Sequence, residues 1–255
     1  MHLSARSGFP RPLRAHAPGA AALAIAALAA ITLPLTALGS PASAATTTAA
    51  SVLKEAKAAI GTQPSAHLEF DAGSSSSSST EKIVADVGTN QGTETVTDGS
   101  AVLHVIATPS GSYISGSPTG LTSLFGMTSA EATKVGTRWE TWKKGTTQYK
   151  NLISVVSVHA LESLLPKSKG TKLATQGSNY VLTWVSPATN SASGSTPKLN
   201  NTLTIAAKGT TLPIAETSTD ASGEKVMTTI SKWGEAIAVH APPASSTVVA
   251  SKVDG

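Results

Sequence analysis

The apolar residues of this chain follow two different periods in a fixed order, and that order limits the folds available to it. Residues 52–60 are apolar at every third or fourth position, which predicts a short helix that ends at Gly61. Apolar and polar residues then alternate, as in AHLEFDA and EKIVADV, which predicts strands with one buried face. The middle of the chain returns to helical spacing, and alternation resumes from NYVLTWV onward.

The resulting order is helix, strands, helices and strands, without the strand–helix–strand alternation of a parallel sheet. We therefore expect an α+β fold in which an antiparallel sheet has its helices segregated to one face. The continuous apolar run AVLHVIA predicts a more central strand. Thr128 to Glu131 matches a capping box and predicts the start of a helix of about two turns. Residues 148–166 predict one longer helix, which Pro166 closes.

The first 44 residues have the pattern of a secretory signal peptide. Arg6, Arg11 and Arg14 precede an apolar run, and Ala42-Ser43-Ala44 has the spacing that a signal peptidase reads. An uncleaved membrane anchor is the alternative, because the run is nearly long enough to span a bilayer. We expect cleavage near Ala44 and a location outside the cytoplasm, secreted or in the cell envelope. The predicted organisation is signal peptide 1–44, linker 45–50, one domain at 51–242 and a flexible tail at 243–255.

Composition excludes several classes of protein. The chain has 19 Lys and Arg residues, but three of them lie in the leader, which leaves 16 against 15 acidic residues. This near balance argues against a nucleic-acid partner, which would need a concentrated basic patch. Because the chain contains no cysteine, disulfides, thiolate metal sites and a lipid anchor on a cysteine are excluded as well.

No catalytic motif stands out from chance. The hydrolase pattern G-x-S-x-G does not occur, and the S-x-x-K matches lack the K-T-G partner of penicillin-binding enzymes. The histidines of the mature chain have no second ligand at metal-binding spacing. We predict no catalytic residues, no metal and no cofactor, and hence no enzyme. A hydrolase assembled from distant residues, with Ser51, His104 or Glu162 as candidates, is the remaining enzymatic alternative.

Two stretches carry a resemblance to a known family. They are SYISGSPTGLTSLFGMTSAEATKVGTRWETW and LPIAETSTDASGEKVMTTISKWGEAIAVHAPP. In their order and spacing they resemble the actinobacterial LppX/LprAFG lipoprotein family, whose fold is similar to the LolA and LolB lipoprotein carriers. The resemblance implies an unclosed, strongly curved antiparallel sheet, a half-barrel, whose concave face is covered by helices and holds lipid acyl chains. The chain departs from the family at Ala44-Ala45, where lipoprotein members carry a cysteine.

We therefore predict a secreted carrier or binding protein for lipid or another apolar ligand of the cell envelope. We expect a monomer that makes at most transient contacts with membrane or envelope proteins. The alternative is an envelope interaction or structural module with a filled core. The candidate cavity-lining residues are the apolar members of the central strand, the helices and the later strands, and the alternative for each is an ordinary closed core. They are Val102, Ile106, Leu121, Leu124, Phe125, Leu152, Val156, Leu164, Leu182, Trp184, Leu203 and Ile205.

Overall fold

One large sheet organises the molecule. The computed structural model describes residues 47–72, 81–187, 198–221 and 223–253, so the predicted signal peptide and the serine-rich loop at 73–80 lie outside the described residues. The sheet has twelve strands in the order β12-β6-β5-β4-β3-β2-β1-β11-β10-β9-β8-β7. Every pairing is antiparallel except that of β12 with β6, and no pairing joins the edge strands β7 and β12. The predicted α+β class with an unclosed antiparallel sheet is confirmed.

The strands are short and most follow one another directly along the sheet. Their bounds are β1 Ser65–Ala72, β2 Glu81–Gly88, β3 Gly92–Asp98, β4 Ala101–Ala107, β5 Gly111–Gly116, β6 Trp139–Lys143, β7 Lys172–Gln176, β8 Asn179–Pro187, β9 Lys198–Ala206, β10 Pro213–Thr219, β11 Lys225–Ser231 and β12 Thr247–Val249. The first five form a meander, and the return of the chain places β11 beside β1. The two halves of the sheet therefore join in its middle.

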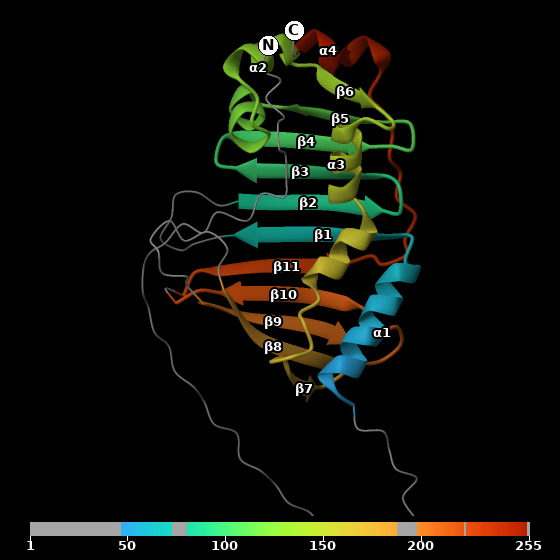
Figure 1. The fold of residues 1–255 in the computed structure, drawn as a ribbon, viewed down its shortest axis with the longest axis vertical. Coiled ribbons are helices and arrows are strands. Elements are labelled where there is room, and N and C mark those ends of the chain that lie inside the picture. The colour runs from blue at the N-terminus through green and yellow to red at the C-terminus, as the bar shows by residue number, and fades with distance from the viewer. Residues whose placement is uncertain (1–46, 73–80, 188–197, 222, 254–255) are drawn as a thin grey trace, which may run out of the picture.

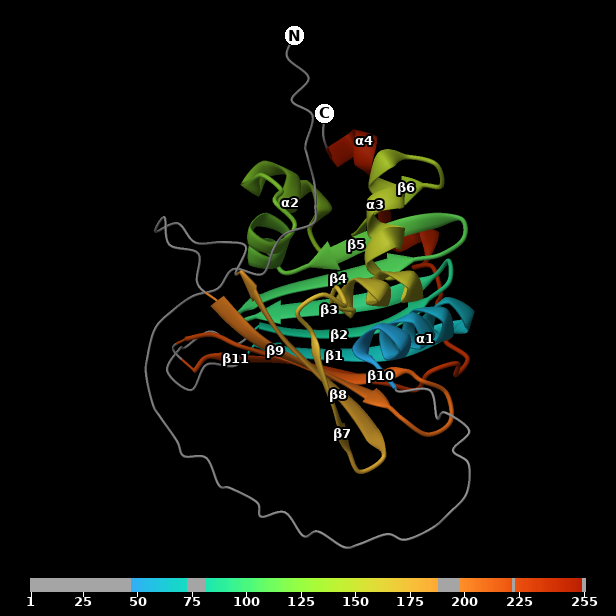
Figure 2. The ribbon, with the colours of Figure 1, turned by 60° about the horizontal axis from the view of Figure 1, so that its bottom comes forward.

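Most of the helices lie on one face of the sheet. Their bounds are α1 Ala49–Thr62, the π-helix η1 Gly120–Leu124, α2 Ser129–Val135, α3 Thr147–Val155, the 3-10 helices η2 Val158–Leu164 and η3 Ala244–Ser246, and α4 Ala250–Val253. Figure 1 shows α1 and α3 in front of the same face of the strands, and Figure 2 shows how far β7–β9 twist away from β1–β4. We call the covered face the inner face and the opposite one the outer face.

Capping side chains determine where two of the helices begin. The side chain of Thr48 accepts a hydrogen bond from the Ser51 backbone, so α1 begins at Ala49 and takes in the last two residues of the predicted linker. The capping box predicted at Thr128 and Glu131 is confirmed, because each side chain bonds the other residue's backbone N–H.

The single helix predicted over 148–166 is two helices, α3 and η2. The Ser157 hydroxyl accepts from the backbone N–H of His159 and caps η2. The carbonyl of Val156 accepts instead from Gly88 N, 3.2 Å away at the end of β2. A contact with the sheet thus replaces the next helical turn. Gly92 on β3 allows this close approach, since a Cβ there would lie 2.6 Å from the Val156 oxygen.

The prediction of a flexible tail at 243–255 is wrong for its described part. Residues 247–249 form β12 beside β6, and α4 follows directly. Val248 and Val253 are both buried in the cluster that contains the core residues of β4 and β5. Proline and serine enrichment suggests fraying, but two apolar side chains buried against an otherwise open sheet edge outweigh it.

We expect Val248→Ala to lower the free energy of unfolding by about 2 kcal/mol, because it removes methyl groups from a packed cluster. Val249→Ala is the matched control, because the Val249 side chain, next to Val248 on the same strand, is 39% exposed. Urea denaturation monitored by circular dichroism measures both. Equal midpoints for the two variants would show that the tail does not pack as described.

Candidate functional site

The pleat of the sheet decides which residues face the helices. Residues directly opposite each other on neighbouring strands share a face, so the register traces the inner face across the sheet. Phe70 lies opposite Ile83 on one side and Thr228 on the other, and Thr228 lies opposite Glu216. The same row continues from Ile83 to Val96. These positions belong to the inner face.

Ten of the twelve predicted lining residues belong to clusters that face the helices, but the structure does not bring them together in one place. Leu121, Leu152 and Val156 are buried in a cluster over β3–β6, with Leu124 and Phe125 packed against it. Leu164 packs against a second cluster, over β1, β2 and β11. The third cluster lies between α1 and the strands β8 and β9; from the predicted set it contains Leu182, Leu203 and Ile205, with Trp184 packed against it.

Val102 and Ile106 are placed wrongly by the prediction. Along β4 the buried residues are the alternate ones, with Leu103 and Val105 in the cluster that faces the helices. Val102 and Ile106 are only partly buried and point to the outer face. Because AVLHVIA is apolar at nearly every position, its composition does not distinguish the faces, whereas the pairing of Val105 with Ile114 does.

The middle of the inner face carries apolar side chains that the sequence analysis does not assign to the site. Leu68 packs against the second cluster and Ile83 against the first, but both stay only partly buried, and Phe70 between them is 7% exposed. Phe70 belongs to none of the three clusters. We call Leu68, Phe70 and Ile83 the central panel. Their alternation in AHLEFDA and EKIVADV signals a shared face, but nothing in that pattern signals a site.

Two carboxyl groups flank the central panel on the same face. Glu94 lies opposite Ala85, whose other neighbour is Leu68. Glu216 lies opposite Thr228, and Thr228 in turn lies opposite Phe70, so all three residues share one row. Within the described part of the chain, neither side chain has a hydrogen bond or an ion pair. The sequence offered one signal for Glu94, because Val96 two residues later is buried on the same face.

Burial makes both carboxyl groups hard to ionise. Desolvation raises the pKa of Glu94 to about 7, and the charge of Glu81 on the neighbouring strand adds to the effect. Desolvation alone raises the pKa of Glu216 to about 7. At neutral pH, each carboxyl group is therefore protonated in a large fraction of the molecules, and the protonated form can donate a hydrogen bond.

Another polar group on the inner face, the side-chain amide of Asn201, has its hydrogen bonds satisfied. Asn201 is buried, and its amide donates to the hydroxyl of Ser186 at 2.9 Å. Its carbonyl accepts from Ser218 at 2.7 Å. These contacts give the amide the partners that a buried polar group requires. Glu94 and Glu216 differ from it because their oxygens remain available to another molecule.

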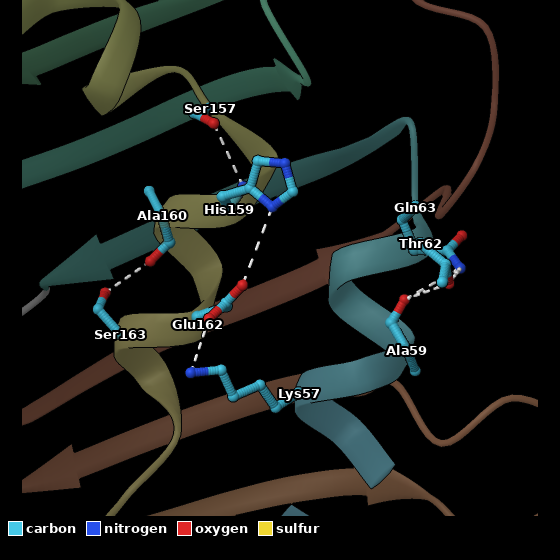
Figure 3. A network of polar contacts seen from close by, with 9 residues as sticks. All are labelled: Lys57, Ala59, Thr62, Gln63, Ser157, His159, Ala160, Glu162 and Ser163. Carbon is cyan, nitrogen blue, oxygen red and sulfur yellow. Dashed lines mark hydrogen bonds and ion pairs between the residues drawn. The ribbon is translucent and has the colours of Figure 1, made fainter. Parts of the chain in front are cut away.

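Glu162 of η2 is the centre of a group of polar contacts on the covering helices (Figure 3). Lys57 of α1 lies 3.2 Å from Glu162 of η2, and His159 Nδ1 lies 3.9 Å from the other oxygen of the same carboxylate. Lys57 and His159 are exposed, and the contact of Lys57 with Glu162 joins α1 to η2. The helices therefore present a neutralised acidic residue beside the site.

The residues of the hydrolase alternative do not come together. Ser51 bonds Thr48 in the cap of α1, and Glu162 holds the contacts just described. His104 lies on the outer face, where it bonds the hydroxyl of Thr95 at 3.1 Å and contacts the ring of Trp139. Among the described residues, no group of three or more His, Cys, Asp or Glu side chains could hold a metal ion.

Comparison with known proteins gives a likeness in structure only. No protein family model matches the sequence, and no curated protein matches it either. Among solved structures, the chain is similar to LprF from Mycobacterium bovis, with 15% identity and a TM-score of 0.45 over 77% of this chain and 97% of that one. It is also similar to the lipoprotein LppX from Mycobacterium tuberculosis, with 16% identity and a TM-score of 0.34 over 75% and 98%. The ligand has to be argued from the residues of this chain.

We expect Glu94→Gln and Glu216→Gln to stabilise the protein increasingly as the pH rises above about 4.5, with most of the gain reached by about pH 7. Each carboxyl group has a higher pKa in the folded state than in the unfolded state, so between about pH 4.5 and 7 the folded state holds a proton that the unfolded state has lost. The unchanged protein therefore loses stability as the pH rises through that window, whereas a glutamine variant does not. Each variant should gain of the order of 1–3 kcal/mol at pH 8 and almost nothing at pH 4.

Urea midpoints of each variant and the unchanged protein at the two pH values measure this effect. Thr93→Gln is the control, because it places the same amide on the outer face of β3 without removing a carboxyl. A glutamine variant that gained equally at pH 4 and pH 8 would contradict the assignment of a raised pKa.

Proposed function

We propose that the protein is a non-enzymatic carrier or binding protein that holds an apolar ligand, such as a lipid acyl chain, against the inner face of its sheet. The observation that carries this proposal is the central panel. Leu68 and Ile83 lie under the helical layer and still keep part of their surface exposed. Each methylene of a ligand buried there would contribute about 0.8 kcal/mol, so a long chain needs few polar contacts.

The division of the core supports the proposal. Domains of this size usually have one contiguous core, whereas here the buried residues form three clusters along the sheet. Two of them lie over β1–β6 and β11, and the third lies over β8 and β9. A cover made of separate helical pieces, rather than one continuous layer, leaves the panel incompletely packed.

The proposed location is outside the cytoplasm, secreted or in the cell envelope. The leader pattern of residues 1–44 supports export, and its cleavage near Ala44 would release residues 45–255 as a monomer that can carry an apolar cargo through water. In the described part of the chain, no helix has the length and hydropathy needed to cross a bilayer.

Native mass spectrometry tests the proposal directly. The protein is expressed with its leader and recovered after export, and its mass also reports the cleavage site. We expect bound species that gentle activation releases and that organic extraction identifies as lipids. A ligand-free protein that also fails to take up N-phenyl-1-naphthylamine, an uncharged apolar fluorophore, would overturn the proposal in favour of a module with a filled core.

A pair of neighbouring substitutions tests the face that binds. Ile83→Thr removes apolar surface from the central panel, and we expect about tenfold weaker binding of N-phenyl-1-naphthylamine. Val84→Thr is the matched control, because it makes a similar change one residue away on the outer face of β2. Fluorescence titration gives both dissociation constants. Equal weakening by the two changes, or none by Ile83→Thr, would show that the ligand does not contact the inner face.

A further inference from the structure

The strands sort their charged residues by sign. Acidic residues occur on both faces, and the inner face carries Glu81, Glu94, Asp98, Glu140 and Glu216. Every lysine in the described strands, by contrast, points to the outer face and is exposed; these are Lys82, Lys143, Lys172, Lys198 and Lys225. The described strands contain no arginine. Their inner face therefore combines apolar side chains with carboxyl groups and presents no cation.

The basic residues described on α1, α3 and η2 form no ion pair with Glu94 or Glu216. Lys57 and His159 are the basic groups of α1 and η2 nearest the carboxylate of Glu162, and both are in contact with it. Lys54 of α1 and Lys150 of α3 are exposed. A carboxylate removed from water without a cation or a hydrogen-bond donor is costly, so Glu94 and Glu216 favour any occupant that supplies one.

We propose, building on the proposed function, that the ligand is an amphiphile whose polar group donates hydrogen bonds and carries no negative charge. An amine or hydroxyl group binds at Glu94 or Glu216, and the apolar chain lies on the central panel between them. Glu94 on β3 and Glu216 on β10 are four strand intervals apart, or about 19 Å at the usual spacing between strands. The apolar side chains of β2 and β1, with Thr228 and Ile230 of β11, occupy that interval.

The same geometry discriminates against anionic amphiphiles. A fatty-acid carboxylate placed on this face would meet like charge from two sides, and no described lysine of the strands could neutralise it. An ammonium group would form a charge-assisted hydrogen bond, which is stronger than the neutral bond a hydroxyl would form. We therefore expect the order amine, alcohol, carboxylate for ligands that share one apolar chain.

Displacement of N-phenyl-1-naphthylamine from the exported protein tests this order at pH 8, where both carboxyl groups are mainly ionised. The competitors are decylamine, decanol and decanoate. We expect decylamine to displace the fluorophore at a concentration at least about tenfold lower than decanoate does, with decanol between them. In the double variant Glu94→Gln, Glu216→Gln, the displacing concentration of decanoate should be less than about threefold that of decylamine, while the displacing concentration of decanol changes little.

A matched double variant on the outer face provides the control. Glu69→Gln with Asp86→Asn removes two carboxyl groups from β1 and β2 without touching the inner face, so the order should persist. Equal displacement by the three competitors, or a preference that survives in Glu94→Gln, Glu216→Gln, overturns this inference and leaves the carrier proposal standing. Failure of the fluorophore to bind at all overturns both. Urea denaturation of each variant confirms that it is folded before displacement is measured.

Discussion

The pleat of one continuous antiparallel ladder is the constraint on which the structure depends. From β6 to β7, each strand is held to its neighbour in a fixed register, so each residue's face is decided by its partners across the strand. That register gathers Leu68, Phe70 and Ile83 at the centre of the inner face. It also places Glu94 and Glu216 on the same face, from segments more than a hundred residues apart.

The helices cover this face in separate pieces, and a buried cluster also lies over the middle strands β1, β2 and β11. α3, with η1 and α2, buries the strands on one side, and α1 buries β8 and β9 on the other. η2 lies between them and is joined to α1 through Glu162. A sheet that does not close has to bury its apolar face against separate helical pieces. In the proposed function, the ligand replaces protein contacts between these pieces.

Local signals in the sequence were sufficient where one interaction decides the structure. The capping box at Thr128 formed as expected, and the alternation in AHLEFDA correctly indicated a strand with Leu68 and Phe70 on one face. Signals failed where distant contacts compete with local preference. The helical pattern over 148–166 is interrupted because the Val156 carbonyl bonds Gly88, and the tail folds because β6 leaves an edge for β12.

By itself, the sequence determined the class of fold, the period of each element and the absence of cysteine chemistry, because these depend on residues close together in the chain or on composition alone. Only the tertiary structure decided which side of AVLHVIA faces the helices, with Leu103 and Val105 inside and Val102 and Ile106 outside. Only the tertiary structure brought Glu94 and Glu216 onto one apolar face, where neither forms an ion pair with another residue that the structure describes. The physical reason is that burial and charge pairing depend on strands that meet across the sheet, and a linear pattern does not encode which strands those are.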